Sequence, residues 1–355
     1  MKDRLVRLRD AMERAQLPAL LVTSRYNRRY LSGFTGSSGV LLVTEKAGVL
    51  LTDFRYMEQA SEQAEGWEVL DHSGNWLQAL RDLAQARGVQ RVGFEREHVT
   101  YAVYQQLLQE AGGVEWVGTP PLIEPLREQK DSAELQLIRA AAEIADRSFQ
   151  HILEVIRPGM TERQVAAELE YHMKSLGASG PSFDTIVASG VRSSLPHGVA
   201  SQKTLQRGEL ITLDFGAYYE GYCSDLTRTI ALGDPGEKAR QIYETVRVAQ
   251  RTGLEKIRPG MTGKEADGVV RAVIEESGYG DAFGHGTGHA IGLEIHEAPS
   301  LSPRSQTTLR EGMVVTVEPG IYLPGVGGVR IEDDVLLTAE GLEVLTTSPK
   351  AWIQL

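Results

Sequence analysis

Short apolar runs alternate with helical patterns along the first third of the chain. Runs rich in Val and Leu predict strands at residues 19–24, 39–44, 48–53, 91–95 and 114–118. Apolar positions at helical spacing predict helices at residues 56–64, 75–87 and 100–111. The N-terminal residues add an amphipathic helix, with Leu5, Leu8 and Met12 set among charges. This alternation predicts an α/β domain.

A proline-rich stretch separates this domain from the rest of the chain. Three prolines within residues 120–125 disfavour helix and strand alike, which indicates a linker. An Asp-x-x-Glu capping box at residues 131–134 then opens a long predicted helix. Because one domain typically has about 150 residues, we predict two domains, at residues 1–124 and 125–355.

The second domain contains an internal repeat. The pentapeptide RPGMT occurs at residues 157–161 and again at residues 258–262, each time ahead of a helical pattern. Further along, LQRGELITLDFG matches LREGMVVTVEPG, which brings Asp214 into register with Glu318. Two such matches in the same order indicate a duplicated unit with approximate two-fold symmetry. A site on that axis would receive one acid from each half.

Each half of the repeat carries two acids that flank a glycine-containing turn between apolar runs. These are Asp214 and Asp225 in the first half, and Glu318 and Glu332 in the second. Two buried carboxylates 4 Å apart repel by roughly 4 kcal/mol at an effective dielectric of about 20, so a cation is expected between them. Such oxygen ligands suit Mn(II), Co(II), Fe(II) or Zn(II), and four carboxylate charges match two divalent ions.

Three of the eight histidines lie in the glycine-rich segment GHGTGHAIGLEIHE, between the two acid pairs. Its four glycines make a helix costly, at about 1 kcal/mol each, so His285 and His289 do not form a helical metal pair. We expect a loop that enters a strand at residues 290–296. His289 and His296 would face opposite sides of a regular strand. For both to reach one centre, the strand must bend or the centre must lie beyond its end.

Composition and charge narrow the class of protein. The chain is 41% hydrophobic and 24% charged, as in globular proteins, and has no run of about 18 apolar residues that could span a membrane. Its net charge of -11 argues against nucleic acid or anionic lipid as a partner. The N-terminus lacks the apolar centre of a signal peptide, and the single cysteine, Cys223, fits a reducing compartment. We expect a soluble, cytoplasmic protein.

Together, the acid pairs and the histidine segment resemble the metallopeptidase family with the pita-bread fold, which includes methionine aminopeptidase, aminopeptidase P and prolidase. The resemblance covers the chain from about residue 125 to its end. The family's metal ligands, Asp, Asp, His, Glu and Glu, match Asp214, Asp225, His289, Glu318 and Glu332 in that order.

The first domain is similar to the N-terminal domain of the creatinase, prolidase and aminopeptidase P branch, through YLSGFTGSSG and LLTDFRYMEQA. Methionine aminopeptidase lacks this domain. The resemblance therefore implies a creatinase-like α/β N-terminal domain, followed by an α+β pita-bread catalytic domain with an internal pseudo-two-fold repeat.

The resemblance also implies a dinuclear site that activates water for attack on a peptide carbonyl. Asp214 and Glu332 would bridge both metals, Asp225 would hold one, and His289 with Glu318 would hold the other. Glu318 would also carry the proton of the attacking water. Mn(II) is the expected metal, with Co(II) or Zn(II) as alternatives.

The same resemblance also implies roles for residues that surround the metal ligands. His197 and His296 would contact the substrate and stabilise the tetrahedral intermediate, and His285 would join them in binding the substrate. Arg330 would orient ligand carboxylates through bidentate hydrogen bonds. A dipeptidase must also pair the product-side carboxylate, and similar prolidases often place an arginine directly after HExP. Ser300 occupies that position here, and Arg304 is the candidate substitute.

We expect the substrates to be Xaa-Pro dipeptides, because an Xaa-Pro bond lacks an N–H group and a site shaped for the pyrrolidine ring would select it. Aminopeptidase P activity on longer peptides is the close alternative. Creatinase-like C–N hydrolysis without metals and a catalytically silent binding module are the other hypotheses. Retention of all five ligands argues against creatinase-like hydrolysis. The histidines and the acidic charge argue against a silent binding module. The family suggests a homodimer.

Overall fold

The computed structural model describes residues 2–110 and 112–355. The chain divides into two compact units, Met1–Arg127 and Glu128–Leu355. The expected boundary after residue 124 falls within the short helix α6 (Glu124–Arg127). Pro125 lies in the first turn of this helix, where a missing N–H group leaves no hydrogen bond unmade. Among the described residues, no helix combines the length and apolar character needed to cross a bilayer.

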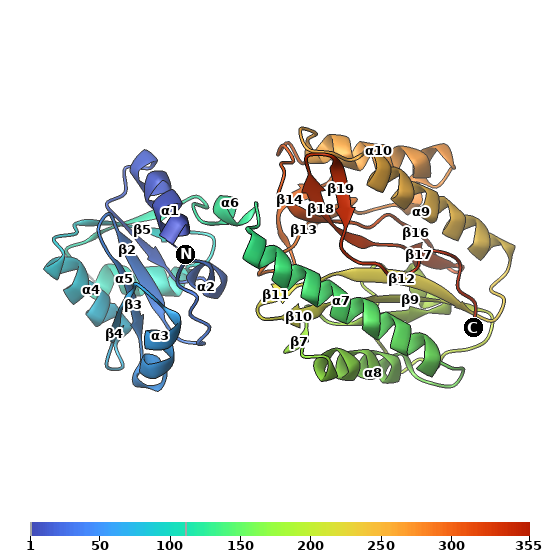
Figure 1. Cartoon of the computed structure of the whole chain (residues 1–355), viewed down its shortest axis with the longest axis horizontal. Helices are drawn as coiled ribbons and strands as arrows, with labels where there is room; N and C mark the ends of the chain where they lie inside the picture. Colours follow the sequence, from blue (N-terminus) through green and yellow to red (C-terminus); the bar gives the residue numbers. More distant parts are fainter. Residues whose placement is uncertain (1, 111) are drawn as a thin grey trace. The chain divides into compact units, whose positions relative to one another are not determined.

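The first unit is a six-stranded mixed sheet with helices packed against it (Figure 1). The strand order is β4-β3-β2-β1-β5-β6, and β2 pairs antiparallel with both β1 and β3, whereas the other pairs are parallel. The strands are β1 (Ala19–Val22), β2 (Val40–Thr44), β3 (Gly48–Thr52), β4 (Glu68–Asp71), β5 (Arg91–Glu95) and β6 (Glu115–Thr119). The helices are α1 (Lys2–Arg14), α2 (Arg25–Ser32), α3 (Met57–Gln63), α4 (Trp76–Ala86) and α5 (Tyr101–Glu110), with a 3-10 turn at Phe54–Tyr56.

The predicted strands and helices of this unit are confirmed. Ala111, the last residue of the predicted helix at 100–111, lies outside the described residues. β4 and α2 are not predicted from the sequence. β4 lies at the sheet edge and has only two apolar residues, Val69 and Leu70, so it carries little of the pattern that marks a strand.

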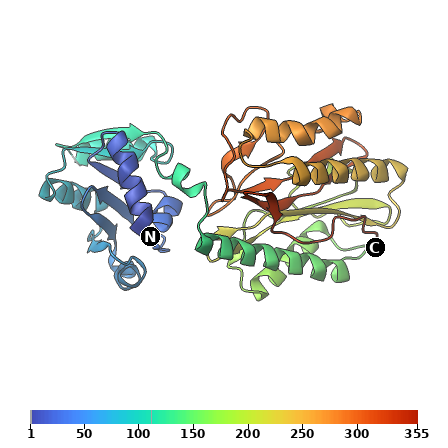
Figure 2. The same ribbon diagram turned by 45° about the horizontal axis from the view of Figure 1, so that its top comes forward.

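The second unit places strands between two pairs of helices (Figures 1 and 2). One pair is α7 (Ser132–Val155) with α8 (Glu162–Ser175), and the other is α9 (Glu237–Lys256) with α10 (Gly263–Glu276). The first pair shares a buried core with strands of the first half of the unit, and the second pair shares another with strands of the second half. The capping box predicted at residues 131–134 is confirmed at the start of α7.

The strands of this unit form four small sheets. Their orders are β12-β9-β8, β14-β13-β15-β18-β19, β16-β17 and β11-β10-β7. The first-half strands are β7 (Gly180–Pro181), β8 (Ile186–Ser189), β9 (Glu209–Phe215), β10 (Ala217–Tyr219), β11 (Tyr222–Cys223) and β12 (Leu226–Leu232). The second-half strands are β13 (Gly288–Ala290), β14 (Glu297–Leu301), β15 (Val314–Val317), β16 (Gly320–Leu323), β17 (Gly327–Arg330), β18 (Asp333–Thr338) and β19 (Gly341–Val344). Two 3-10 turns lie at Gly190–Ser194 and Gly280–Ala282.

Matching hydrogen bonds in the two halves support the duplication. The N–H group of Gly159 donates to the carbonyl of Leu205 at 2.9 Å, and that of Gly260 donates to Leu309 at 2.9 Å. Both copies of RPGMT end in a threonine that caps the following helix through a capping box. The repeated sequence therefore has the same local structure in each half.

The strand predicted at residues 290–296 is wrong. β13 ends at Ala290, and β14 begins only at Glu297. Between them, the N–H group of Gly292 donates to the carbonyl of Glu294 at 3.0 Å, and the N–H group of Glu294 donates to the Glu297 carboxylate at 3.1 Å. These local partners occupy backbone donors that a strand would use in its ladder, so the chain turns.

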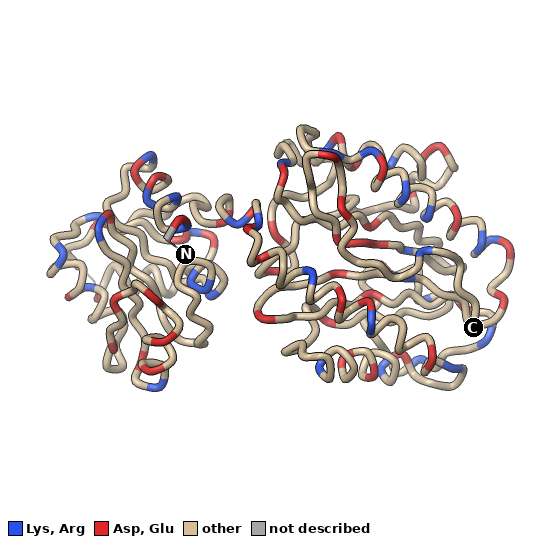
Figure 3. The backbone as a smooth tube through the Cα atoms, in the orientation of Figure 1, with Lys and Arg blue, Asp and Glu red and all other residues tan. Residues whose placement is uncertain are grey.

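Acidic and basic residues are interspersed along the backbone of both units (Figure 3). The chain has 48 acidic and 37 basic residues in total. The expectation that nucleic acid is not a partner stays a prediction.

Candidate active site

One cavity of about 500 Å³ in the second unit brings the predicted ligands together. The site residues that line it are Asp214, Asp225, His289, Glu318, Glu332, His197, His285, His296 and Arg330. Arg304 is exposed and follows β14, outside the lining of this cavity. The residues that the sequence placed in both halves of the repeat therefore surround a single space.

Antiparallel pairing of neighbouring strands brings each acid pair together. β9 pairs with β12, so Asp214 lies opposite Thr227, two residues beyond Asp225. In the second half, β15 pairs with β18 in a register that joins Val317 to Asp333. Glu318 and Glu332, which adjoin this pair, therefore lie at the same end of the ladder. In neither half are the paired strands consecutive, since β10 and β11 intervene along the chain in the first half, and β16 and β17 in the second.

Asp225, His289 and Glu332 have the arrangement of a metal site. Each offers a ligand atom, and these three atoms lie within 4.8 Å of one another. The Oδ1 atom of Asp225 is buried and has no hydrogen-bond partner among the described residues, and its Oδ2 atom lies 3.7 Å from Nε2 of His289. A buried carboxylate oxygen without a partner is costly, and a bound cation would supply one.

The imidazole of His289 is oriented for ligation. Its Nδ1 atom lies 3.1 Å from the carbonyl of Ala290, which requires Nδ1 to donate and leaves the lone pair on Nε2. Nε2 faces the acids and lies 3.5 Å from Oε1 of Glu318. Burial, followed by the nearby His296, lowers the pKa of His289 to about 4, so the ring is neutral. Neutral imidazole is the form that binds metals.

The carboxylates of the cavity are crowded and buried. Burial raises the pKa of Asp225 well above its usual value, and the charges of Glu332 and Asp214 raise it further. Burial likewise raises the pKa of Glu332, with added repulsion from Glu318 and Asp214. The pKa of Glu318 rises to about 8, again chiefly through burial. Divalent cations would relieve this repulsion, so the donor set and its electrostatics fit the predicted metal centre.

Arg330 connects the acids to a second group of side chains. Its Nη2 atom donates to Asp214, its Nε atom donates to the hydroxyl of Thr227 at 3.2 Å, and its Nη1 atom donates to the hydroxyl of Tyr322 at 2.8 Å. The guanidinium thus spreads its donors over several partners and contacts Asp214 through one nitrogen, in place of the expected bidentate pair. The hydroxyl of Tyr322 also lies 2.8 Å from Nε2 of His285. No pattern in the sequence marked Tyr322.

His197 and His296 are exposed residues at the cavity. The rings of His289 and His296 have their centroids 4.4 Å apart, because the chain leaves the strand after Ala290. The sequence leaves open whether the chain bends between His289 and His296 or the centre lies beyond the end of the strand. The structure shows that the chain bends. Burial and the nearby His197 lower the pKa of His296, and burial lowers the pKa of His285 to about 4.

Glu162, which the sequence analysis did not single out, holds the loop that carries His197. Its side chain is fully buried at the start of α8. The carboxylate accepts hydrogen bonds from the N–H group and hydroxyl of Ser189 at 2.8 and 2.9 Å, and from those of Ser201 at 3.0 and 2.6 Å. Arg192 Nε donates to it at 3.0 Å. The two ends of the loop are thereby fixed to one helix.

Comparisons with known proteins identify the family of the chain. A model of metallopeptidase family M24 matches residues 136–339, and a model of the creatinase/prolidase N-terminal domain matches residues 4–129. The Xaa-Pro dipeptidase of Pyrococcus horikoshii is 40% identical over 355 residues, covering 99% of both chains.

Two solved structures have nearly the same fold. A structure described as an Xaa-Pro dipeptidase from Bacillus anthracis has a TM-score of 0.98 and 50% identity, covering 100% of this chain and 99% of that one. The X-Pro aminopeptidase of Thermotoga maritima has a TM-score of 0.91 and 40% identity, covering 98% of this chain and 100% of that one. The chain therefore belongs to metallopeptidase family M24 and carries the creatinase/prolidase N-terminal domain.

Proposed function

We propose that this chain hydrolyses Xaa-Pro dipeptides with a dinuclear metal centre held by Asp214, Asp225, His289, Glu318 and Glu332. Asp214 and Glu332 would bridge two divalent ions, Asp225 would hold one, and His289 with Glu318 would hold the other. Mn(II) is the proposed metal, with Co(II) or Zn(II) as alternatives. The observation that carries the proposal is the convergence of these five side chains from both halves of the repeat on one cavity.

The chemistry divides between the metal centre and the side chains. When bound, two divalent ions lower the pKa of a water molecule and polarise a peptide carbonyl. The carboxylate of Glu318 would accept the proton of the attacking water and return it to the departing proline nitrogen. Arg330, fixed by Tyr322 and Thr227, would keep Asp214 in a single orientation.

Histidines on the exposed side of the site would bind the substrate. His197 and His296 each offer a ring nitrogen to the oxygen on which negative charge develops, and their place in the cavity lining supports this role. His285 also lines the cavity, but Nδ1 lies 2.8 Å from the carbonyl of Gly286 and Nε2 lies 2.8 Å from the hydroxyl of Tyr322. Since both nitrogens have protein partners, His285 would contact the substrate by packing.

Apolar residues of the cavity wall would select proline. Phe183, Ile186, Val199 and Ile295 line the cavity and offer a surface of the kind that a pyrrolidine ring fills. Arg304 remains our candidate for the product-side carboxylate. Since it lies outside the cavity lining, it would have to reach the substrate from the exposed segment after β14.

Xaa-Pro aminopeptidase activity on longer peptides is the second candidate. Two observations favour it: the likeness to the Thermotoga maritima enzyme, and the position of Arg304 outside the cavity, with Ser300 in the lining. An open product side without a cation would admit a longer peptide. For the cellular setting, we propose a cytoplasmic homodimer that binds neither nucleic acid nor membrane.

Turnover of Ala-Pro, Ala-Pro-Ala and Ala-Ala by the full-length chain loaded with Mn(II) tests the proposal. We expect Ala-Pro to have the highest kcat/KM and Ala-Ala to be a poor substrate. Faster turnover of Ala-Pro-Ala would replace the dipeptidase with the aminopeptidase. Hydrolysis of Ala-Ala at the rate of Ala-Pro would overturn the proline specificity, and failure to hydrolyse all three would overturn both candidates.

A further inference from the structure

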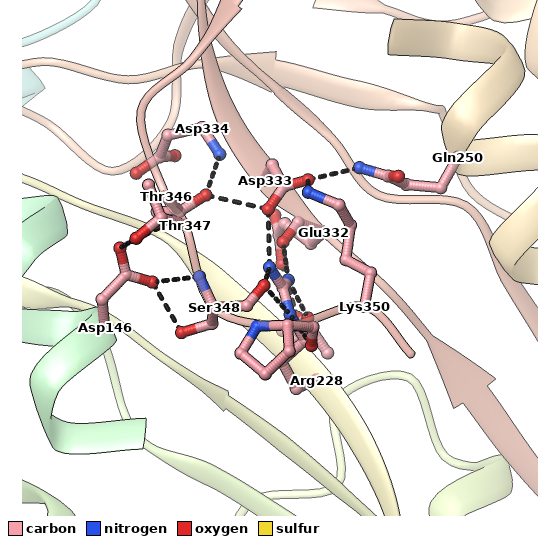
Figure 4. A network of polar contacts seen from close by, with 12 residues as sticks. Asp146, Arg228, Gln250, Glu332, Asp333, Asp334, Thr346, Thr347, Ser348 and Lys350 are labelled. Carbon is pink, nitrogen blue, oxygen red and sulfur yellow. Dashed lines mark hydrogen bonds and ion pairs between the residues drawn. The ribbon is translucent and has the colours of Figure 1, made fainter. Parts of the chain in front are cut away.

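The C-terminal segment, residues 346–350, forms hydrogen bonds with Asp333 and Asp334, which directly follow the proposed ligand Glu332 (Figure 4). We infer that this segment positions the metal ligands Asp225 and Glu332, so that its polar contacts set the affinity of the centre for divalent ions. The inference rests on the proposed function for the identity of the ligands. Residues 346–350 are not part of the cavity lining, so they would act only through other side chains.

Asp334 connects the segment to Asp225. The backbone N–H group of Asp225 donates to Oδ2 of Asp334 at 2.9 Å, and both residues are buried. The N–H group of Asp334 in turn donates to the hydroxyl of Thr346 at 3.1 Å. The same hydroxyl donates to Oδ1 of Asp333 at 3.0 Å. A displaced Thr346 would therefore release the residue that fixes the backbone of Asp225.

Asp333 accepts hydrogen bonds from three parts of the chain, namely β12, α9 and the C-terminal segment. Its fully buried carboxylate accepts hydrogen bonds from Arg228 at 2.7 Å and Thr346 at 3.0 Å on Oδ1, and from Gln250 at 2.5 Å and Lys350 at 2.8 Å on Oδ2. Two of these donors, Arg228 and Lys350, are cations that form ion pairs with the carboxylate. The residue next to Glu332 is therefore held from both the strands and the C-terminal segment.

Arg228 connects the segment to Glu332 itself. Its buried guanidinium donates through Nη1 to the carbonyl of Glu332 and, at 2.9 Å, to the carbonyl of Thr227. Through Nη2 it donates to the carbonyl of Ser348 at 2.7 Å. The hydroxyl of Thr227 donates to the Glu332 carboxylate. The backbone of Glu332 is thus fixed by Arg228, which the C-terminal segment helps to hold, and the side chain of Glu332 is fixed by Thr227, whose carbonyl is bonded to the same guanidinium.

Asp146, on α7, also holds the C-terminal segment in place. One carboxylate oxygen accepts from the N–H group and hydroxyl of Thr347 at 2.6 and 2.8 Å, and the other accepts from those of Ser348 at 2.7 and 2.6 Å. Asp146 is buried and lies outside the cavity lining. It can therefore be changed without touching a proposed ligand.

Mn(II) affinity of the full-length chain, measured by calorimetric titration after chelator treatment, tests the inference. Asp146→Asn removes an acceptor for the backbone of the segment, and Lys350→Met removes one donor to Asp333. We expect each variant to bind Mn(II) about tenfold more weakly or worse, as is usual when a residue that orients a ligand is lost. Lys350→Arg should restore most of the affinity.

Arg139→Met is the matched control. Arg139, on α7, forms an ion pair with Glu343, on β19, at 2.5 Å. This ion pair is partly exposed and shares no residue with the network around Asp333. This variant should bind Mn(II) as the wild type does. Thermal melting without metal identifies variants that fold, and if Asp146→Asn does not fold, Lys350→Met decides, because its side chain is 29% exposed.

Folded variants with less than a tenfold loss of affinity would overturn the inference, even where their melting temperature falls, because that pattern describes a purely structural role. Failure of the proposed function would look different. In that case the wild-type chain itself would bind no Mn(II), or would bind it without hydrolysing Ala-Pro.

Discussion

The hydroxyl oxygen of Tyr322 lies 2.8 Å from the Nε2 atom of His285. Because Nδ1 of His285 donates to the carbonyl of Gly286, Nε2 accepts, so the tyrosine is the donor. The same oxygen accepts a 2.8 Å hydrogen bond from Arg330, which also holds Asp214. One phenol thus links a wall of the cavity to a proposed metal ligand.

Tyr322→Phe should lower activity with little change in fold. The variant leaves Arg330 and His285 each without one partner, so Asp214 is less firmly oriented. We expect kcat/KM for Ala-Pro to fall roughly tenfold, and the free energy of unfolding to fall by about 1 kcal/mol. Steady-state kinetics and thermal melting measure the two effects. Wild-type kinetics in this variant would show that the link has no part in catalysis.

Glu318→Gln should abolish most turnover while the fold is retained. The amide cannot accept the proton of the attacking water, and a general base of this kind contributes about 10² to 10⁴ in rate. Single-turnover kinetics at saturating Mn(II) measure the loss apart from any change in metal affinity. Glu311→Gln, at an exposed turn before β15 and outside the cavity lining, is the control and should keep wild-type activity. A fall of less than tenfold in Glu318→Gln would remove this residue from the proton-transfer role.

Gly288→Ala should destabilise the protein. A Cβ atom at this position would lie 2.0 Å from the backbone oxygen of Thr316, so β13 and β15 would have to separate. We expect the free energy of unfolding to fall by about 1 to 3 kcal/mol. Gly268→Ala is the control, because nothing lies within 4 Å of its added methyl group and it is helical, and it should keep or gain stability. Equal denaturation midpoints for the two variants would contradict the close packing of Gly288 against the backbone of Thr316.

Glu162→Gln should destabilise the protein in a pH-dependent way. Burial raises the pKa of Glu162, but hydrogen bonds from Ser201 and Ser189 lower it more, so it lies below its ordinary value of 4.5. A pKa lowered by folding means that the carboxylate stabilises the fold fully above pH 4.5, and that this contribution is lost as the pH falls through the folded pKa.

We expect Glu162→Gln to cost about 1 to 3 kcal/mol at pH 7 and progressively less below pH 4.5. Urea denaturation across this pH range measures the difference from wild type. Glu154→Gln, at an exposed position of α7, should show no such trend. A pH-independent difference for Glu162→Gln would exclude the ionised carboxylate as the cause.

The sequence predicts the proposed ligands well because they depend on short-range pattern. Asp214 and Glu318 end apolar strands in matching copies of a repeat, and strand pairing then brings Asp225 and Glu332 to the same place. Each of these steps needs only the period of a strand and the position of a turn. The two-domain α/β and pita-bread architecture follows from similarly local signals, together with the resemblance to a known family.

Residues that support the site from a distance could not be predicted in this way. Glu162, Tyr322 and Asp146 act on partners that are at least eight residues away, and nothing in their local sequence distinguishes them from ordinary helix or strand positions. The strand predicted at residues 290–296 is wrong for a more local reason, since the Glu297 carboxylate competes for the backbone N–H group of Glu294. Tertiary contacts decide the roles of Glu162, Tyr322 and Asp146.

The most direct test of the proposed dinuclear centre is the number of Mn(II) ions bound per chain, measured on the sample whose Ala-Pro hydrolysis is assayed. We expect two ions per chain, loss of hydrolysis when a chelator removes them, and recovery when Mn(II) is returned. Hydrolysis that persists after complete removal of metal, or a chain that binds no divalent ion, would contradict the proposed metal centre.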